Sequence, residues 1–435
     1  MKRKIIAKLL EWKGRRNRQP LLVYGARQVG KTYTVNEFGR KHFEDVVYVN
    51  FETNLTIARD LDQDITPQHI IDRLEIFYKK KIVPGKTLLF FDEIQSCERA
   101  LTALKYFCED APEYHVIAAG SLLGVAVNRE RYSFPVGKVD LVHLYPLDLE
   151  EFLWAAGREA LTAEIRVAFN TGKPLPPLLH EMALSLYKAY LIVGGMPAVV
   201  KEYVREERLL DAVNLQSLIV DTYIGDMAKY ATPSETTRIM AAFHSIPAQL
   251  AKDNRKFQYK VIQKGGSATM FGASIDWLNA AGLVIKCNKV SAGTVPLAVH
   301  QDLSGFKLYM GDVGLLTLRS GMPAHNIFAP TGVNDTFVGA IAENYVATQL
   351  RANGHDLYYW ESSYIAEIDF VIQAGDRVIP LEVKSGVHTR SRSLSVFKEK
   401  YKPGQAIRVS ARNFGVENEI RSLPLYAVFC IERGF

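Results

Sequence analysis

A phosphate-binding pattern near the start of this 435-residue chain is the first sign of chemistry. The residues from Gly25 to Thr32 read G-x-x-x-x-G-K-T, after an apolar run and before a stretch that can continue as a helix. The glycines let successive backbone N–H groups point at one oxyanion. Lys31 is expected to reach the β- and γ-phosphates of a nucleotide, and the Thr32 hydroxyl to bind Mg²⁺. The predicted nucleotide-binding residues are Gly25, Ala26, Arg27, Gln28, Val29, Gly30, Lys31, Thr32 and Tyr33.

An acidic pair supports this pattern. Residues 87–91 read as a strand that is buried on both faces, and Asp92 and Glu93 follow it directly. Asp92 is predicted to hold the Mg²⁺ through its water shell, and Glu93 to polarise the attacking water as general base. The alternatives are a polar turn at the acids and a glycine turn that binds nothing at the loop. Because both patterns occur together, the sequence favours an ATP site with Lys31 and Glu93 among its catalytic residues.

The elements that must position these side chains alternate along the chain. Apolar runs predicted as strands are separated by helical stretches, which is typical of a parallel α/β sheet. These runs are 21–24, 46–51, 87–91, 115–119 and 139–144. In the P-loop class that carries a glutamate after the acidic strand, the run 115–119 lies between the loop strand and the acidic strand. Ser121, just after that run, is then predicted to sense the γ-phosphate; the alternative is a helix N-cap.

A second set of acids lies near the C-terminus. Asp369 lies in one predicted strand, and Glu382 and Lys384 lie two residues apart in the next, so both leave the same strand face. The arrangement resembles the PD-(D/E)xK nucleases, in which Asp369 and Glu382 would bind a divalent ion and Lys384 would activate water. Glu343, on the preceding helix, would be an extra acid. The alternatives are a hairpin with exposed charges and a salt bridge in which Lys384 alone relieves the repulsion between the acids.

The order of the motifs resembles one branch of the AAA-type ATPases. The segments that carry the likeness are VYGARQVGKT, LLFFDEIQ, VIAAGSLLG, FPVGKV, LYPLDLEEF, GGMP, KLYMGDVGLL and LEVKSG. The resemblance covers nearly the whole chain and implies an AAA-like core that uses ATP and Mg²⁺, with a C-terminal domain of unknown function. In related ATPases an arginine finger that reaches a neighbouring subunit's phosphate lies in the region of Arg129 and Arg131. Arg131 is therefore a predicted catalytic residue in a homo-oligomer; the alternative is a plain charged loop.

The pattern changes in the middle of the chain. Helical stretches near 236–251, 258–263 and 272–282 precede two strand-like runs, 283–290 and 306–312. Helices followed by a β-hairpin suggest a winged helix, whose second helix would enter the major groove of DNA. The candidate helix carries few basic residues, so an interaction or spacer domain is the alternative.

Composition bounds the partners. The net charge of +6 is compatible with nucleic acid without establishing it. The four cysteines show no metal-binding spacing, and no apolar segment approaches the roughly 18 residues of a membrane span. We therefore expect a cytoplasmic protein with no membrane partner.

The predicted fold class is α/β: a P-loop NTPase parallel sheet with a helical lid, a winged-helix-like middle domain and a C-terminal restriction-endonuclease-like domain. The predicted bounds are 1–175, 176–235, 236–325 and 326–435 for the core, lid, middle and C-terminal domains. Two functions are open. One is an ATPase that acts on or with DNA, and the other is a nucleotide-gated regulatory or partner-binding protein with an inactive nuclease-like platform.

Overall fold

The chain divides into two compact units in a computed structural model. The model describes residues 1–121, 135–206, 208–253, 255–329, 335–362, 366–387 and 392–434. The P-loop unit comprises Lys2–Tyr145 with Ala280–Gly282, and the C-terminal unit comprises Pro146–Asn279 and Leu283–Phe435. The three segments predicted after residue 175 thus fall, but for Ala280–Gly282, within one unit.

The P-loop unit is built on a five-stranded parallel sheet. Its strands are β1 (Leu21–Tyr24), β2 (Asp45–Asn50), β3 (Thr87–Asp92), β4 (His115–Gly120) and β5 (Asp140–His143). They lie in the order β2-β3-β4-β1-β5, and every neighbouring pair is parallel. This order confirms the predicted parallel sheet, with β4 between the loop strand and the acidic strand.

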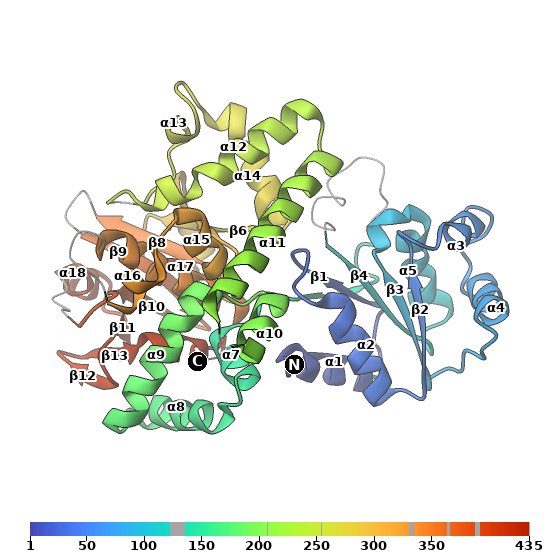
Figure 1. Cartoon of the computed structure of the whole chain (residues 1–435), viewed down its shortest axis with the longest axis horizontal. Coiled ribbons are helices and arrows are strands. Elements are labelled where there is room, and N and C mark those ends of the chain that lie inside the picture. Colours follow the sequence, from blue (N-terminus) through green and yellow to red (C-terminus); the bar gives the residue numbers. More distant parts are fainter. Residues whose placement is uncertain are drawn as a thin grey trace. The chain divides into compact units, whose positions relative to one another are not determined.

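Helices cover both faces of this sheet (Figure 1). One face packs on α4 (Pro67–Tyr78) and α5 (Glu98–Asp110), since alternate strand residues share a hydrophobic core with these helices. The other face carries α2 (Lys31–His42), which approaches β2 and β3 closely. A Cβ atom on Gly39 would lie 2.6 Å from a Val46 methyl and 3.0 Å from a Leu88 methyl, so a glycine is needed there. Among the described residues of this unit, α1 (Ile5–Gly14) and α3 (Leu55–Asp60) are further α-helices.

The C-terminal unit begins with a run of helices. Their bounds are α7 (Leu149–Ala155), α8 (Glu159–Thr171), α9 (Pro177–Val193), α10 (Pro197–Glu206), α11 (Leu209–Tyr230), α12 (Pro233–Leu250), α13 (Tyr259–Ile262) and α14 (Ala268–Ala280). The predicted proline-rich break separates α8 from α9, and the residue before α12, Thr232, forms a capping box with Glu235. The helical middle region agrees with the prediction from periodicity.

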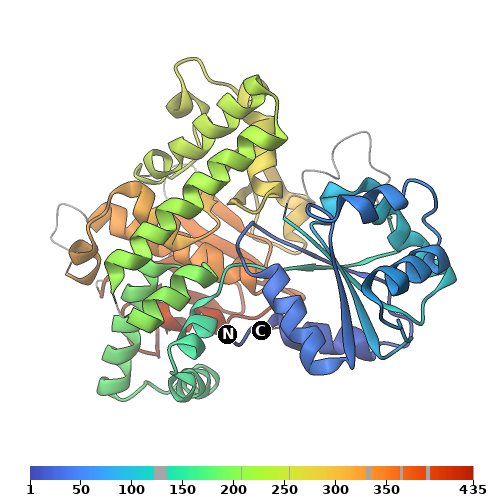
Figure 2. The ribbon, with the colours of Figure 1, turned by 45° about the vertical axis from the view of Figure 1, so that its right-hand side comes forward.

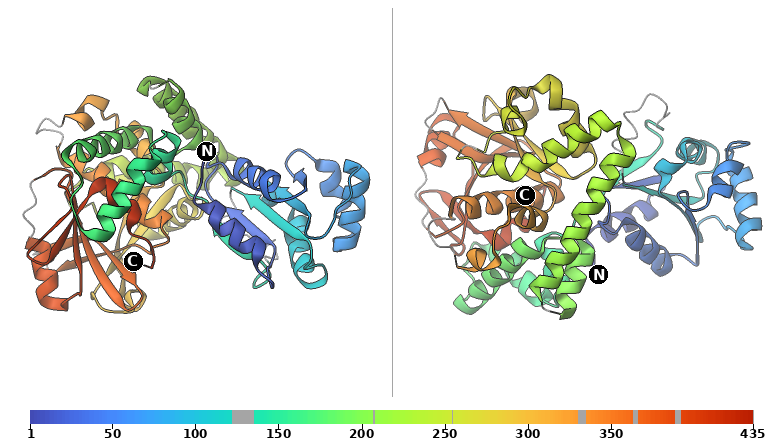
Figure 3. Two further views of the ribbon diagram at one scale, coloured as in Figure 1. Left: turned by 90° about the horizontal axis from the view of Figure 1, so that it is seen from below. Right: turned by 45° about the horizontal axis from the view of Figure 1, so that its top comes forward.

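An eight-stranded mixed sheet follows; its gold to red strands lie together in Figure 2 and Figure 3. Its order is β12-β13-β11-β10-β9-β8-β6-β7. The strands are β6 (Val284–Val290), β7 (Gln301–Met310), β8 (Tyr358–Ser362), β9 (Ala366–Ala374), β10 (Arg377–Val383), β11 (Ala406–Ser410), β12 (Gly415–Glu417) and β13 (Ile420–Pro424). The hairpin β6–β7, which the sequence assigns to a winged helix, continues this sheet through parallel pairing of β6 with β8. The predicted boundary at residue 325 therefore crosses one continuous sheet.

Among the described residues, the α-helices that accompany the sheet include α15 (Val313–Ser320), α16 (Ala324–Phe328), α17 (Asp335–Ala352) and α18 (Arg392–Tyr401). The predicted apolar face of α17, including Ile341, Tyr345 and Leu350, is buried. Glu343, on the same helix, is buried as completely. Such burial of a carboxylate requires partners, which are described below. Among the described residues, none of the helices has the length and hydropathy needed to cross a bilayer.

Candidate nucleotide-binding site

The loop between β1 and α2 has the backbone shape that its glycines make accessible. A Cβ atom on Gly25 would lie 2.1 Å from the carbonyl oxygen of Leu144, so a side chain cannot be accommodated. Gly30 adopts φ 90° and ψ 26°, a left-handed conformation, directly before the first residue of α2. The loop thus curls back and delivers its end to a helix N-terminus, whose partial positive charge favours an anion.

Lys31 lies inside this curve. Its side chain is buried, and its Nζ donates hydrogen bonds of 3.0 Å to the Gly25 carbonyl and 2.8 Å to the Ala26 carbonyl. Burial lowers the pKa of Lys31 to about 8, although the nearby Glu93 and Asp92 carboxylates oppose that shift. The ammonium is therefore held by neutral oxygen atoms at the place where the sequence predicts a phosphate contact.

Asp92 joins the loop to the acidic strand. The Thr32 hydroxyl donates a 2.7 Å hydrogen bond to Oδ2 of Asp92, so the structure brings the two predicted Mg²⁺ residues together. The same oxygen accepts a 3.0 Å bond from the hydroxyl of Tyr48 on β2. Burial raises the pKa of Tyr48 to about 12, which keeps this phenol protonated as a donor.

Sequence reasoning missed Tyr48. Its signal was present in the alternation of β2, because Asn50 pairs in register with Asp92 and Tyr48 lies two residues earlier on the same strand face. Asn50 in turn donates a 3.3 Å hydrogen bond to the Tyr48 hydroxyl. Both polar side chains therefore converge on the acidic end of β3.

Glu93 and Ser121 lie beside this centre. Glu93 has a left-handed φ of 50°, and burial is the main cause that raises its pKa above the usual range. The Gln95 amide donates a hydrogen bond to its carboxylate. Ser121 is buried just after β4, whose last residue pairs with Tyr24 before the loop, so it lies at the same edge of the sheet. Arg129 and Arg131 lie outside the described residues.

The predicted C-terminal residues also come together. β9 and β10 are antiparallel, which places Asp369 and Glu382 on neighbouring strands. The backbone N–H of Val383 donates a 2.8 Å hydrogen bond to Asp369, and the Lys384 ammonium lies 3.1 Å from a Glu382 carboxylate oxygen. This pair agrees with the salt-bridge alternative for Lys384.

Lys307, on β7, is a further cation that the sequence did not indicate. Its Nζ lies 3.0 Å from Glu343 and 2.7 Å from Glu367, and 3.9 Å from Asp369. Glu343 also accepts hydrogen bonds from Tyr309 and Arg255. Within the described ranges, no group of three or more His, Cys, Asp or Glu side chains is arranged to hold a metal ion.

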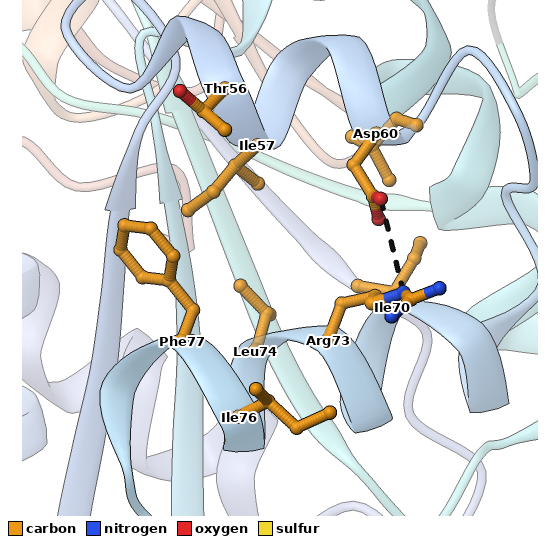
Figure 4. A pocket seen from close by; sticks show the side chains of 9 residues that line it. Thr56, Ile57, Asp60, Ile70, Arg73, Leu74, Ile76 and Phe77 are labelled. Atoms are coloured by element: carbon orange, nitrogen blue, oxygen red, sulfur yellow. Dashed lines mark ion pairs between the residues drawn. The ribbon is translucent and has the colours of Figure 1, made fainter.

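A pocket lies apart from the phosphate loop, between α3 and α4 of the P-loop unit (Figure 4). Its volume is about 190 Å³, and aliphatic side chains and Phe77 form most of its wall. Asp60 and Arg73 form a 3.8 Å ion pair at this wall. None of the predicted site residues lines it.

Comparison with protein families places these units in known classes. Residues 17–153 match the AAA domain, residues 184–326 a domain of unknown function (DUF8612), and residues 338–428 a domain of unknown function (DUF4143). The chain therefore carries an AAA-type P-loop ATPase domain followed by these two domains.

Individual relatives are distant. An uncharacterized protein of Methanocaldococcus jannaschii is 25% identical over 204 residues, which make up 47% of this chain and 39% of that protein. The chain thus spans about two fifths of this curated relative's length. Among solved structures, the Walker-type ATPase of Pyrococcus abyssi is similar with a TM-score of 0.44 and 13% identity, over 72% of this chain and 94% of that one. Domain III of the Thermotoga maritima replication initiation protein DnaA gives a TM-score of 0.28 and 14% identity, over 51% and 84%.

Proposed function

We propose that the P-loop unit binds ATP with Mg²⁺ at Gly25–Tyr33 and hydrolyses it. The observation that carries this proposal is the hydrogen bond between Thr32 and Asp92, formed at the end of a loop that already encloses the Lys31 ammonium. A magnesium ion needs hard oxygen ligands beside the phosphates, and this pair supplies them from two elements.

Each residue has a separate role in the proposed reaction. Lys31 and the loop N–H groups bind the phosphates. Thr32 and Asp92 would hold the Mg²⁺, which would supply positive charge beside the phosphate oxygens. Glu93 orients and deprotonates the attacking water, and its raised pKa makes the carboxylate a stronger base than an ordinary glutamate. Ser121 contacts the γ-phosphate.

The direct test is release of phosphate from ATP·Mg²⁺ by the full chain. We expect turnover by the wild type and its loss in Asp92→Asn, because the metal is then held by one charge fewer. Asp110→Asn is a matched control, since Asp110 is an acid at the end of α5 and outside the site. Equal rates in wild type and Asp92→Asn would reject the proposed site.

A trans-acting arginine belongs to the same proposal. If Arg129 or Arg131 completes a neighbouring subunit's site, specific activity should rise with protein concentration as the chain associates. An Arg131→Ala protein, whose P-loop is intact, should then regain activity when it is mixed with a Lys31→Ala protein, whose arginine is intact. A rate independent of concentration in a demonstrated monomer would exclude this part.

The C-terminal unit has two candidate functions. ATP-dependent action on DNA, with a metal held by Asp369 and Glu382, is supported by the buried Oε2 of Glu382, which has no hydrogen-bond partner among the described residues. A nucleotide-gated platform that recognises nucleic acid or a protein without cutting is supported by the protein cations that already pair with these acids.

A divalent-dependent cleavage assay separates the two candidates. Single- and double-stranded DNA would be incubated with Mg²⁺ or Mn²⁺, with and without ATP. Cleavage that disappears in Asp369→Ala selects the DNA-acting enzyme. DNA that stays intact but shifts in a mobility assay selects the platform.

A further inference from the structure

We propose that the ammonium of Lys307 is the resident cation of the C-terminal acid cluster and occupies the position at which the clustered carboxylates would otherwise bind a divalent metal. The Lys307 cluster is defined as Lys307, Glu343, Glu367 and Asp369. The proposal rests on the C-terminal unit alone and is independent of ATP hydrolysis in the P-loop unit.

Distances place the ammonium among the carboxylates. Lys307 Nζ lies 2.7 Å from Glu367 Oε1 and 3.0 Å from Glu343 Oε1, both within ion-pair contact. Its distance to Asp369 Oδ1 is 3.9 Å. The three acids come from α17 and β9, and the cation comes from β7, so one charge joins three elements.

Burial makes this cation necessary. The side chains of Lys307 and Glu343 are 1% and 0% exposed, so water cannot solvate either charge. Glu367 and Asp369 keep 28% and 16% exposure, so the requirement is strictest for Glu343. An isolated buried charge is costly, and neighbouring carboxylates repel each other, so Glu343 requires a cation beside it. Lys307 meets that requirement with a covalently attached group.

Further donors contact the carboxylates of Glu343 and Asp369. Glu343 accepts hydrogen bonds from the Arg255 guanidinium and from the Tyr309 hydroxyl. Asp369 accepts one from the backbone N–H of Val383. Incoming Mg²⁺ or Mn²⁺ would have to approach a bound ammonium and a guanidinium, and like charges at contact distance repel strongly at low dielectric.

Strand geometry explains how Lys307 reaches this place. β7 pairs antiparallel with β6, with Lys307 opposite Cys287, and residues two apart on a strand share a face. Lys307 and Tyr309 therefore project together, and both contact Glu343 on α17. The hairpin that the sequence assigns to a winged helix thus supplies a cation to Glu343 and Asp369, which the sequence assigns to a nuclease-like site.

The test is a titration of nucleotide-free full chain with Mn²⁺, followed by electron paramagnetic resonance. Every sample carries Asp92→Asn, so that the P-loop unit contributes no metal site. In the protein that keeps Lys307, we expect Mn²⁺ binding to be unchanged by substitution of Glu367 or Asp369. Lys307→Met should gain one Mn²⁺ site per chain, and adding Glu367→Gln should remove it again.

Two controls accompany the titration. Lys307→Arg keeps a positive charge and should gain no site. Lys289→Met removes a lysine that pairs with Glu361 and Asp302 at a more exposed position, so it should gain none either.

If Lys307→Met folds, two results would overturn the proposal. One is Mn²⁺ binding in the Lys307-containing protein that is lost in Asp369→Asn. The other is a Lys307→Met protein that is folded by circular dichroism yet gains no site. If Lys307→Met does not fold, Glu367→Gln in the Lys307-containing protein decides. Unchanged Mn²⁺ binding there supports the proposal, and weakened binding rejects it.

Discussion

Two buried lysines of this chain lie beside acidic residues and have different partners. Lys31 in the P-loop unit donates to two backbone carbonyls, with Asp92 and Glu93 close enough to affect its pKa. Lys307 in the C-terminal unit lies in contact with carboxylates. A lysine held by neutral oxygens keeps its positive charge available for an incoming anion. When a lysine is paired with carboxylates, their negative charges already balance the charge of the ammonium. The chemistry of a lysine beside acids therefore depends on which oxygens it contacts.

The largest expected effect is the loss of folding stability when Glu343 is removed. Glu343→Ala leaves Lys307 buried with fewer anions, and breaking a buried ion pair costs about 3–5 kcal/mol in the free energy of unfolding. Urea unfolding of the full chain measures this loss. The matched control is Asp302→Ala, which removes a more exposed partner of Lys289 and should cost less than about 1 kcal/mol. Similar losses in both variants would mean that the buried Lys307 cluster contributes no more to stability than the more exposed ion pair of Lys289.

Glu93→Gln should separate binding from turnover in the P-loop unit. The amide cannot accept the proton of the attacking water, so turnover should fall roughly 10²-fold or more while ATP stays bound. Steady-state hydrolysis and equilibrium binding on the same preparation give both numbers. A variant that hydrolyses ATP at the native rate would remove Glu93 from the mechanism.

Tyr48→Phe tests the second donor to Asp92. The variant loses a 3.0 Å hydrogen bond to the Asp92 carboxylate, which is proposed to hold Mg²⁺, and loss of such a bond typically weakens metal affinity about 10-fold or more. The readout is the Mg²⁺ concentration for half-maximal hydrolysis. Tyr78→Phe is the control, because Tyr78 donates only to the backbone carbonyl of Tyr48. An equal effect of both variants would mean that the change acts through the position of β2 and not through the hydrogen bond to Asp92.

The pH dependence of ATP affinity gives a smaller effect. Below pH 8 the Lys31 ammonium is charged in the nucleotide-free protein, and above it the proton is lost. Because phosphate favours the charged form, binding takes up a proton above pH 8, and affinity should fall by up to about tenfold per pH unit there. Calorimetry in buffers of different ionisation enthalpy measures this uptake. Affinity that stays level up to about pH 9 would contradict the assignment.

Much of the P-loop unit could be predicted from sequence. Its strands are short apolar runs between helices, and the loop and acidic motifs have fixed positions relative to them. Local patterns therefore placed Lys31, Thr32 and Asp92 at one edge of the sheet. Tyr48 was missed because its role depends on which strand lies beside β3, and sheet order comes from long-range packing.

Local sequence patterns predicted only part of the C-terminal unit. Its strands and the antiparallel approach of Asp369 to Glu382 agree with the prediction from alternation and the intervening turn. The contact between Lys307 and Asp369 was not predicted, because Lys307 lies 62 residues before Asp369 and reaches it through the pairing of β6 with β8. The available signal was a lysine within the apolar end of β7, residues 306–310, because a charge on a buried face needs a partner.

The most direct measurement is a calorimetric titration of ATP·Mg²⁺ into the wild type, Lys31→Met and Lys307→Met. Loss of a hydrogen-bonded charge at the phosphates should weaken binding roughly 10- to 100-fold in Lys31→Met. Lys307→Met should bind ATP like the wild type, because the Lys307 ammonium contacts the C-terminal acids and has no part in the proposed nucleotide site. Equal affinity of the wild type and Lys31→Met would contradict the account of the nucleotide site.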